Sequence, residues 1–141
     1  MAKTGMILLI EDDIDDKQFF EDIVRDLGFK NEIKWFENTD DAFQFLITSK
    51  KPIFIIFSDI NLPGQNGLEF KFKIDNDPKL RKRSIPFIFY STSAFQKDVN
   101  EAYTKMTVQG FFKKGTDHKE TAQIIKLILD YWTLCKNPNI L

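Results

Sequence analysis

The sequence has few of the residues that build disulfides, zinc sites and membrane spans. Among its 141 residues are one cysteine, Cys135, and one histidine, His118. A single cysteine excludes an intrachain disulfide and favours a reducing compartment, and a single histidine excludes a zinc site built from several histidines. The first apolar run is short and is followed at once by Glu11, Asp12 and Asp13, so it is neither a signal peptide nor a membrane span. We therefore expect a cytoplasmic protein that does not contact membranes.

A surplus of charge is also missing. The chain has 20 lysines and arginines against 21 aspartates and glutamates, which gives a net charge of −1. General nucleic-acid binders carry a basic surface, so we expect no nucleic-acid partner, and we interpret the basic run at residues 79–83 as a solvated loop. Hydrophobic residues make up 43% of the chain and 15 residues are phenylalanine, which predicts a folded protein. The length predicts one domain over residues 1–141.

Apolar runs alternate with amphipathic segments along the chain. The predicted strands are residues 6–10, 32–36, 53–58, 86–90 and 108–112, and the predicted helices are residues 16–27, 40–49, 67–74, 94–106 and 116–134. Five such β-α repeats with short links are typical of an α/β fold with a doubly wound, five-stranded parallel sheet and five helices. The third strand begins with five apolar residues without a polar break, so we expect it to be covered on both faces.

Polar residues follow four of the five predicted strands. They are Glu11, Asp12, Asp13, Asp59, Ser91, Thr92, Lys113 and Lys114. Because the carboxyl ends of parallel strands meet at one edge of a sheet, we expect one pocket to hold two or three carboxylates, a hydroxyl and an ammonium group. Two carboxylates about 4–5 Å apart repel by roughly 3–4 kcal/mol at an effective dielectric constant near 20. Either one of them is protonated, or a cation lies between them.

These side chains are a suitable set for phosphoryl chemistry. Carboxylate oxygens with room for water molecules suit Mg²⁺. A carboxylate beside bound Mg²⁺ can attack a phosphoryl group, and a lysine and a hydroxyl can bind the oxygens of the new phosphate. The residues therefore predict a site that forms an aspartyl phosphate or hydrolyses one.

Four stretches around these residues form a set. They are Leu8-Leu9-Ile10-Glu11-Asp12-Asp13, Ser58-Asp59-Ile60-Asn61-Leu62-Pro63-Gly64 with Gly67 beyond it, Pro86-Phe87-Ile88-Phe89-Tyr90-Ser91-Thr92, and Gly110-Phe111-Phe112-Lys113-Lys114. In this order and at this spacing they resemble the receiver domain of bacterial response regulators, the phospho-acceptor module of two-component signalling. The resemblance covers about residues 6–134 and implies a stand-alone, flavodoxin-like receiver fold similar to the chemotaxis regulators. The acidic start and the extra residues before the fourth strand are similar to the single-domain regulators that serve phytochrome-type sensor kinases.

The resemblance implies a role for each residue of the pocket. Asp59 is expected to be the phosphorylated residue, and Ser91 and Lys114 are expected to bind the phosphoryl group. The expected ligands of Mg²⁺ are Asp12 and Asp59 directly, Glu11 through water, and the backbone carbonyl of Asn61. The residues expected to respond to phosphorylation are Ser91, Thr92 and Phe111.

Three residues depart from the family pattern. Gly115 stands where a proline usually follows the lysine, often after a cis bond. This departure leaves open whether the Lys114–Gly115 bond is cis, and it makes Lys113 the alternative to Lys114. Thr92 stands where alanine is usual and could slow the entry of water to the phosphate. Phe111 cannot make the hydrogen bond of a tyrosine at that position.

The implied activity is acceptance of a phosphoryl group from a sensor histidine kinase or a histidine phosphotransfer protein. Slow autodephosphorylation would follow, without conventional enzyme turnover. Because no DNA-binding domain follows residue 134, the expected output is contact with an unknown target protein. One alternative is a pseudo-receiver, an interaction module that is not phosphorylated, which Gly115 leaves open. Another is a Mg²⁺-dependent phosphatase of the haloacid dehalogenase type, although such enzymes carry the nucleophile on the first strand.

Some of the polar residues also have simpler interpretations. Asp13, Asp15 and Asp16 could be acids that are favoured at the N-terminus of a helix. The hydroxyls at residues 91–93 could form a helix cap.

The last predicted helix has a wide apolar face. Its apolar residues cover about half of the circumference, whereas a core-facing helix needs only about a 100° stripe. They are Ile124, Ile125, Leu127, Ile128, Tyr131, Trp132 and Leu134. We expect the excess to contact a partner or a second copy of the chain, which would give a homodimer. The alternative is that residues 137–141 fold back over this face.

Overall fold

The computed structural model describes residues 4–137 and shows a three-layered α/β fold. Five strands form one parallel sheet, in the order β2-β1-β3-β4-β5. The strands are β1 (Met6–Ile10), β2 (Ile33–Phe36), β3 (Ile53–Ser58), β4 (Phe87–Ser91) and β5 (Gly110–Lys113). The helices are α1 (Ile14–Asp26), α2 (Thr39–Thr48), α3 (Gly67–Asp75), α4 (Pro78–Arg83), α5 (Gln96–Lys105) and α6 (His118–Leu134). The doubly wound sheet predicted from the sequence is confirmed, with one helix more than expected.

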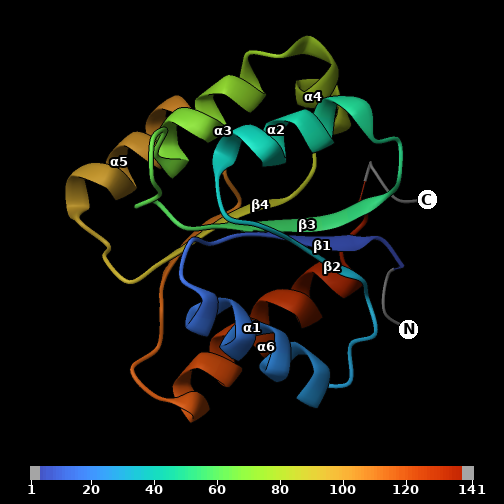
Figure 1. Cartoon of the computed structure of the whole chain (residues 1–141), viewed down its shortest axis with the longest axis vertical. Helices are drawn as coiled ribbons and strands as arrows, with labels where there is room; N and C mark the ends of the chain where they lie inside the picture. The colour runs from blue at the N-terminus through green and yellow to red at the C-terminus, as the bar shows by residue number, and fades with distance from the viewer. Residues whose placement is uncertain (1–3, 138–141) are drawn as a thin grey trace.

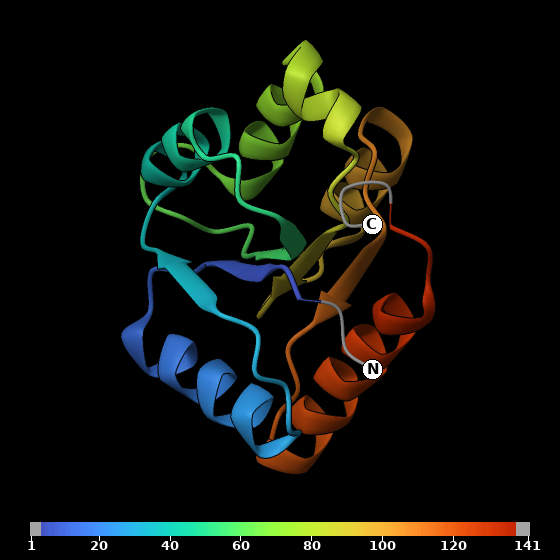
Figure 2. The ribbon, with the colours of Figure 1, turned by 90° about the vertical axis from the view of Figure 1, so that its right-hand side faces the viewer.

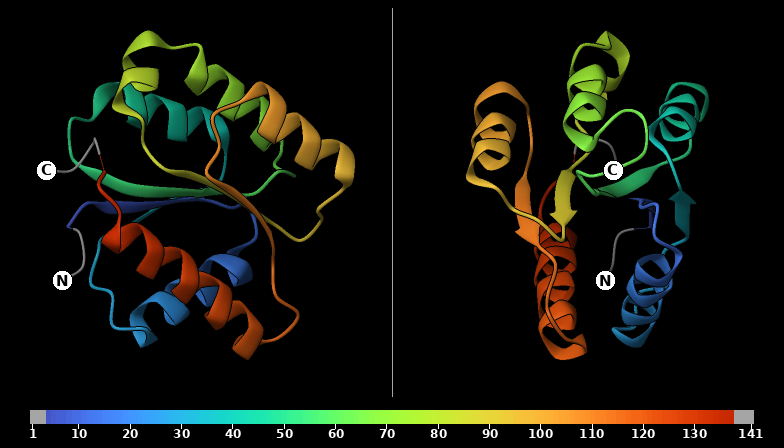
Figure 3. Two further views of the ribbon diagram at one scale, coloured as in Figure 1. Left: turned by 180° about the vertical axis from the view of Figure 1, so that it is seen from behind. Right: turned by 60° about the vertical axis from the view of Figure 1, so that its left-hand side comes forward.

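The two faces of the sheet have separate hydrophobic cores. Helices α1 and α6 cover one face, and α2, α3 and α5 cover the other, as the rotated views show most clearly (Figures 2 and 3). Successive residues of a strand point to opposite faces, so Ile7 and Leu9 pack with α1 and α6 while Leu8 and Ile10 pack on the other side. An unbroken apolar strand is therefore required in the middle of the sheet. All six residues of β3 are buried, as predicted.

The order of the strands places the functional edge between β1 and β3. The chain moves from β1 to β2 on one side and then returns to β3 on the other side, so the connections diverge at this point. In doubly wound sheets the crevice at such a switch point opens at the carboxyl ends of the strands. Ile10 is in register with Ser58, so Glu11 and Asp59 leave the sheet side by side.

The prediction of a solvated loop at residues 79–83 is wrong, because this segment is the short helix α4 (Figure 1). Asp77 caps it by accepting hydrogen bonds from the backbone N–H groups of Lys79 and Leu80, and Pro78 occupies its first turn. Leu80 is the only buried residue of the turn. The run of charged residues gave no apolar pattern from which the helix could be predicted. One apolar side chain, Leu80, and the cap stabilise it. The bounds of the other elements lie within two residues of the predicted ones.

The last helix exposes part of its apolar face, as predicted. Leu127, Tyr131 and Leu134 are exposed, whereas Ile125 and Ile128 pack against the sheet. Asn137 is buried, and its side chain donates a hydrogen bond to the carbonyl of Phe54. The alternative in which the C-terminal tail covers the helix falls on residues 138–141, which lie outside the described residues. Within residues 4–137, no helix combines the length and the apolar character of a membrane span.

Candidate functional site

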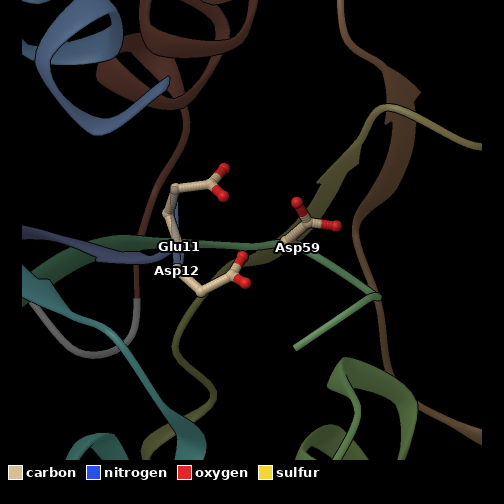
Figure 4. Close-up of side chains that lie close together, drawn as sticks. All are labelled: Glu11, Asp12 and Asp59. Carbon is tan, nitrogen blue, oxygen red and sulfur yellow. The ribbon is translucent and has the colours of Figure 1, made fainter. Parts of the chain in front are cut away.

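Three carboxylates meet at the carboxyl edge of the sheet. Glu11 and Asp12 follow β1 directly, and Asp59 follows β3. The backbone N–H of Asp59 donates to the carbonyl of Ile10 at 3.0 Å, which extends the pairing of β1 and β3 to this point. One carboxylate oxygen from each of the three acids lies within 4.8 Å of the others. Figure 4 shows the three carboxylates facing a common space.

The carboxylate of Asp59 is fixed by donors on several sides. Its Oδ1 accepts hydrogen bonds from the backbone N–H groups of Ile60 at 2.6 Å and Asn61 at 3.2 Å. The hydroxyl of Ser91, at the end of β4, donates to the same oxygen at 2.8 Å. Asp59 is only 6% exposed, but the neighbouring Asp12 is exposed at the mouth of the cluster. The Asp59 side chain is therefore held in place beside an acid that solvent can reach.

Lys114 reaches the acidic cluster from the end of β5. Its ammonium group forms ion pairs with Glu11, with Asp16 at 3.0 Å and with Asp59 at 3.2 Å. Burial opposes the charge on this lysine, but the hydrogen bond and the negative charge of Glu11 outweigh burial and raise the pKa of Lys114. Lys113 is exposed and makes no ion pair with a described residue. The structure thus places Lys114, and not Lys113, in the cluster.

The side chain of Glu11 is buried, and its backbone is held by β2. Its N–H donates to the carbonyl of Phe36 at 3.0 Å, and its carbonyl accepts a hydrogen bond from the indole of Trp35 at 2.7 Å. Burial raises the pKa of the Glu11 carboxyl, although the contact with Lys114 acts in the opposite direction. A carboxyl of raised pKa releases its proton when a cation binds beside it.

Two residues at the site were not predicted from the sequence. Asp16, predicted only as an acid at a helix N-terminus, contacts Lys114 from the first turn of α1. Ser93 accepts a hydrogen bond from the side-chain amide of Asn61 at 3.0 Å, which links the loops after β3 and β4. For Asp16 the available signal was its spacing of four residues from Asp12, which places both acids at the start of the helix. Nothing in the sequence pairs Ser93 with Asn61.

The simpler interpretations have different outcomes. Asp13 is the N-cap of α1, since its carboxylate accepts hydrogen bonds from the N–H groups of Asp15 at 2.8 Å and Asp16 at 3.1 Å. The cap proposed for residues 91–93 is wrong, because α5 begins later, after Phe95, and has no side-chain cap. The hydroxyl of Ser91 does not cap a helix and instead donates its hydrogen bond to Asp59.

Gly115 allows the chain to pass close to the start of α6. A Cβ atom added at this position would lie 2.5 Å from the hydroxyl of Thr121 and 2.6 Å from its backbone nitrogen. A proline would therefore not fit here unless α6 shifted. The peptide bonds of residues 4–137 are all trans, so the lysine reaches the cluster without a cis bond.

The other two unusual residues lie on different sides of the cluster. Thr92 is exposed and, with Tyr90 and Lys114, lines a cavity of about 100 Å³ beside the acids. Burial raises the pKa of Tyr90 to about 12. Phe111 is half-buried and packs on Phe89, with the ring centroids 5.5 Å apart. The structure therefore brings Thr92 to the cluster and leaves Phe111 in the core next to it.

Gly67 lets the loop after β3 fold tightly over the site. A Cβ atom at this position would lie 2.1 Å from the carbonyl oxygen of Asp59, and the N–H of Gly67 donates to the carbonyl of Ile60 at 2.8 Å. Asn66 then caps α3 in a reciprocal arrangement with Glu69. The close approach holds the backbone of Asn61 beside the acidic cluster.

The cluster fits a small divalent cation. Its three carboxylates provide the oxygen donors that hard cations prefer, and the exposed Asp12 leaves room for water. One ammonium group, that of Lys114, pairs with Glu11, Asp16 and Asp59, and Asp12 adds a further acid, so negative charge remains in excess. The arrangement can bind a divalent ion and present a fixed carboxylate, a hydroxyl and a lysine to an incoming anion.

The chain matches the response regulator receiver domain family over residues 7–126. It is 26% identical over 133 residues to the response regulator Rcp1 of Synechocystis sp., an alignment that covers 90% of this chain and 88% of the relative. Its structure is similar to that of the phosphorylated cyanobacterial phytochrome response regulator RcpA, with a TM-score of 0.84, 26% identity, and coverage of 96% and 99% of the two chains. The manganese-bound form of Rcp1 has the same fold, with a TM-score of 0.81, 24% identity, and coverage of 94% and 97%. The chain belongs to the response regulator receiver domain family.

Proposed function

We propose that this receiver domain accepts a phosphoryl group on Asp59 from a phosphohistidine of a sensor histidine kinase or a histidine phosphotransfer protein. The observation that carries the proposal is the fixed position of Asp59, within 4.8 Å of oxygens of Glu11 and Asp12 and in contact with Ser91 and Lys114. No other carboxylate in the described residues combines this set of neighbours.

Mg²⁺ is the proposed cofactor. Asp12 and Asp59 would bind it directly, Glu11 through water, and Asn61 through its backbone carbonyl. Bound Mg²⁺ would neutralise the charge that develops on the phosphoryl oxygens. The oxygen-rich cluster supports this choice, as does the manganese in the related Rcp1 structure.

The residues of the chain would divide the chemistry between them. An oxygen of Asp59 attacks the phosphorus atom, so a P–O bond forms, the P–N bond of the donor breaks and the donor imidazole leaves. The N–H groups of Ile60 and Asn61 keep Oδ1 in place, which leaves Oδ2 to react. Lys114 and the hydroxyl of Ser91 then turn from Asp59 to the new phosphoryl oxygens. Hydrolysis of the acyl phosphate later restores the carboxylate.

We infer that the movement of Ser91 is passed to Phe111 and to the surface formed by α5, β5 and α6. Phe111 lies on β5 in register with Phe89 of β4, and the two rings are in contact. Phe89 is two residues before Ser91, so a shift at the end of β4 would displace the ring of Phe111. The output would be contact with a target protein through this surface. The exposed Leu127, Tyr131 and Leu134 of α6 are also the proposed surface for a homodimer.

Intact-protein mass spectrometry tests the proposal. Incubation with acetyl phosphate and Mg²⁺ should add the mass of one phosphoryl group to the wild type and nothing to Asp59→Ala. Asp13→Asn is the matched control, because Asp13 caps α1 and does not join the acidic cluster. Absence of the mass gain in the wild type would favour the pseudo-receiver, and an equal gain in Asp59→Ala would reject Asp59 as the acceptor.

A further inference from the structure

A second recess lies away from the acidic cluster, lined by residues from the C-terminal end of α2 and from the short helix α4. Figure 1 shows where these two helices lie. The volume of the recess is about 680 Å³. The lining residues are Leu46, Ile47, Ser49, Lys50, Pro52, Asp77, Pro78, Lys79, Leu80 and Arg83. Pro52 precedes the amino end of β3, whereas Asp59 follows its carboxyl end, so the recess, here called the basic groove, belongs to the opposite edge of the sheet.

The floor of the basic groove is apolar. Leu46 and Leu80 form its buried part, and Pro52 and Pro78 lie exposed beside it. Ile47 is 46% exposed, which is unusual for a large aliphatic side chain in a hollow. The groove therefore offers a place for an apolar side chain from outside the molecule.

The rim of the basic groove carries positive charge that the chain does not neutralise. Two exposed lysines, Lys50 and Lys79, line the groove, and Lys51 and Lys82 are exposed cations close to them in the sequence. Within residues 4–137, none of these four side chains forms an ion pair. Asp77, the one acid among the lining residues, caps α4, and the lining cations Lys50, Lys79 and Arg83 outnumber it. A positive patch without partners is unexpected in a chain of net charge −1.

Arg83 differs from these cations because it holds the groove together. Its guanidinium group donates to the backbone carbonyls of Leu46 at 3.4 Å, Ser49 at 3.5 Å and Lys51 at 3.2 Å. These carbonyls belong to the last turn of α2 and the loop after it, so Arg83 fastens α4 to the end of α2. The shape of the groove is therefore set before a partner arrives, which lowers the entropy cost of binding.

We propose that the basic groove binds an acidic segment of a partner protein, which inserts an apolar side chain between Ile47 and Leu80 and places carboxylates on the lysines of the rim. Charge complementarity selects an acidic partner, and the apolar floor selects a protein segment over a nucleic acid, which has no aliphatic side chain to fill it. The floor is recessed, whereas membrane binding requires apolar side chains that protrude. The proposal is independent of phosphorylation, because the groove lies at the other edge of the sheet.

Titration with a synthetic peptide tests the proposal. The probe is a fluorescein-labelled dodecapeptide with leucine and phenylalanine flanked by glutamates, and the second probe has serines in place of both apolar residues. Fluorescence anisotropy gives the affinity, and amide chemical shifts of the full chain give the binding site. We expect shifts at Ile47 and Leu80 with the first peptide, and affinity that falls as salt screens the lysines.

Three variants separate the basic groove from general attraction. Lys50→Glu combined with Lys79→Glu should lower the affinity for the first peptide by roughly tenfold or more, because two attractive contacts become repulsive. Ile47→Gln leaves the charge unchanged and should also lower the affinity for the first peptide. Lys97→Glu combined with Lys119→Glu is the charge-matched control on α5 and α6 and should have little effect on this affinity. Equal weakening in the control, equal affinity for the serine peptide, or no shifts around the groove would overturn the proposal. Tighter binding of duplex DNA or phosphatidylserine vesicles through the same lysines would also overturn it.

Discussion

At the scale of single residues, Lys114 compensates the acids that would otherwise repel one another. Its side chain is 11% exposed, and it pairs with two nearly buried carboxylates and the half-exposed Asp16. Removing one partner from a buried ion pair costs more than forming the pair gains, because the remaining charges stay buried without compensation. The stability of the whole domain is therefore linked to this one ammonium group.

Lys114→Met should lower the free energy of unfolding by about 3 kcal/mol. The loss should be larger at pH 8 than at pH 5. Without the lysine, the pKa of the buried Glu11 rises further, and an acid with a raised pKa in the folded state costs stability as the pH increases above its unfolded value. Urea unfolding at the two pH values measures the effect. Lys113→Met is the control and should change stability by less than about 0.5 kcal/mol; an equal loss in both variants would reject the role given to Lys114.

Mg²⁺ should stabilise the wild type, and Asp12→Asn should remove most of that effect. A ligand present at 100 times its dissociation constant adds about 2.7 kcal/mol to stability if it binds only the folded state. Asp12 is the exposed member of the acidic cluster. The substitution should therefore lower the affinity for Mg²⁺ roughly tenfold or more, with little effect on stability in the absence of the ion. Thermal unfolding with and without MgCl₂ measures this, with Asp26→Asn as a control at the far end of α1. Identical stabilisation of all three proteins would mean that the ion binds elsewhere.

The positions of site residues could be predicted from the sequence where the backbone alone determines them. Glu11, Asp12 and Asp59 follow strands, so the parallel sheet brings them together whatever their side chains do. Asp16 and Ser93 reach the site through side-chain directions at the start of a helix and in a loop. Those directions depend on packing between segments far apart in the chain, which no local pattern reports.

At the scale of the secondary-structure elements, a buried ion pair attaches the end of α5 to α3. Lys71 donates to Asp75 at 2.7 Å and to the hydroxyl of Thr107 at 3.1 Å. The backbone N–H of Thr107 donates a hydrogen bond to the carboxylate of Asp75 at 2.8 Å. Helix α5 has only one fully buried residue, Ala102, so this network supplies much of its attachment. In the sequence, Lys71 looks like an ordinary surface lysine of a helix, and its burial could not be predicted.

Asp75→Asn should destabilise the protein by about 3 kcal/mol near neutral pH. Burial opposes the charge on Asp75, but hydrogen bonds from Lys71 and Thr107 outweigh it and hold the pKa of the carboxyl below its ordinary value. An acid with a lowered pKa contributes stability above its unfolded pKa of roughly 4, and this contribution is lost as the pH falls through its folded pKa. The difference between wild type and variant should therefore shrink below pH 4. Chemical denaturation from pH 3 to pH 7 provides the curve.

Asp130→Asn is the matched control for this prediction. Asp130 pairs with Lys126 at the same spacing of four residues, but both side chains are about half exposed. Exposed pairs of this kind are worth between zero and about 1 kcal/mol. A loss in Asp130→Asn as large as that in Asp75→Asn would contradict the importance of burial. The other elements were predictable from periodicity, and α4 was not, since a helix of six residues is shorter than two turns and shows no period.

At the scale of the whole molecule, three surfaces lie on different parts of the fold. The acidic cluster occupies the carboxyl edge of the sheet, the basic groove lies at the opposite edge, and the exposed face of α6 lies on one side. Near that face, Phe112 of β5 and Trp132 of α6 line a hollow of about 390 Å³ together with Leu127 and Tyr131. The separation lets phosphorylation, docking and self-association be tested one at a time.

Leu127→Glu should convert a dimer into a monomer if two copies pair through α6. Leu127 is 64% exposed, so the substitution places a charge in the proposed interface without disturbing the core. Phe72→Glu is the control, since Phe72 is 53% exposed on α3, on the other side of the sheet. Light scattering coupled to gel filtration measures the masses. A monomeric wild type at high protein concentration, or dissociation by Phe72→Glu as well, would argue against pairing through α6.

The central claim is that Asp59 carries the phosphoryl group, and the most direct measurement is the position of the modification. Borohydride reduces an aspartyl phosphate to homoserine, which peptide sequencing by mass spectrometry can locate. After treatment with acetyl phosphate and Mg²⁺, we predict homoserine at position 59 alone, and none when Mg²⁺ is replaced by a chelator. Homoserine at Asp12 or any other acid instead of Asp59, or none at all, would contradict the account.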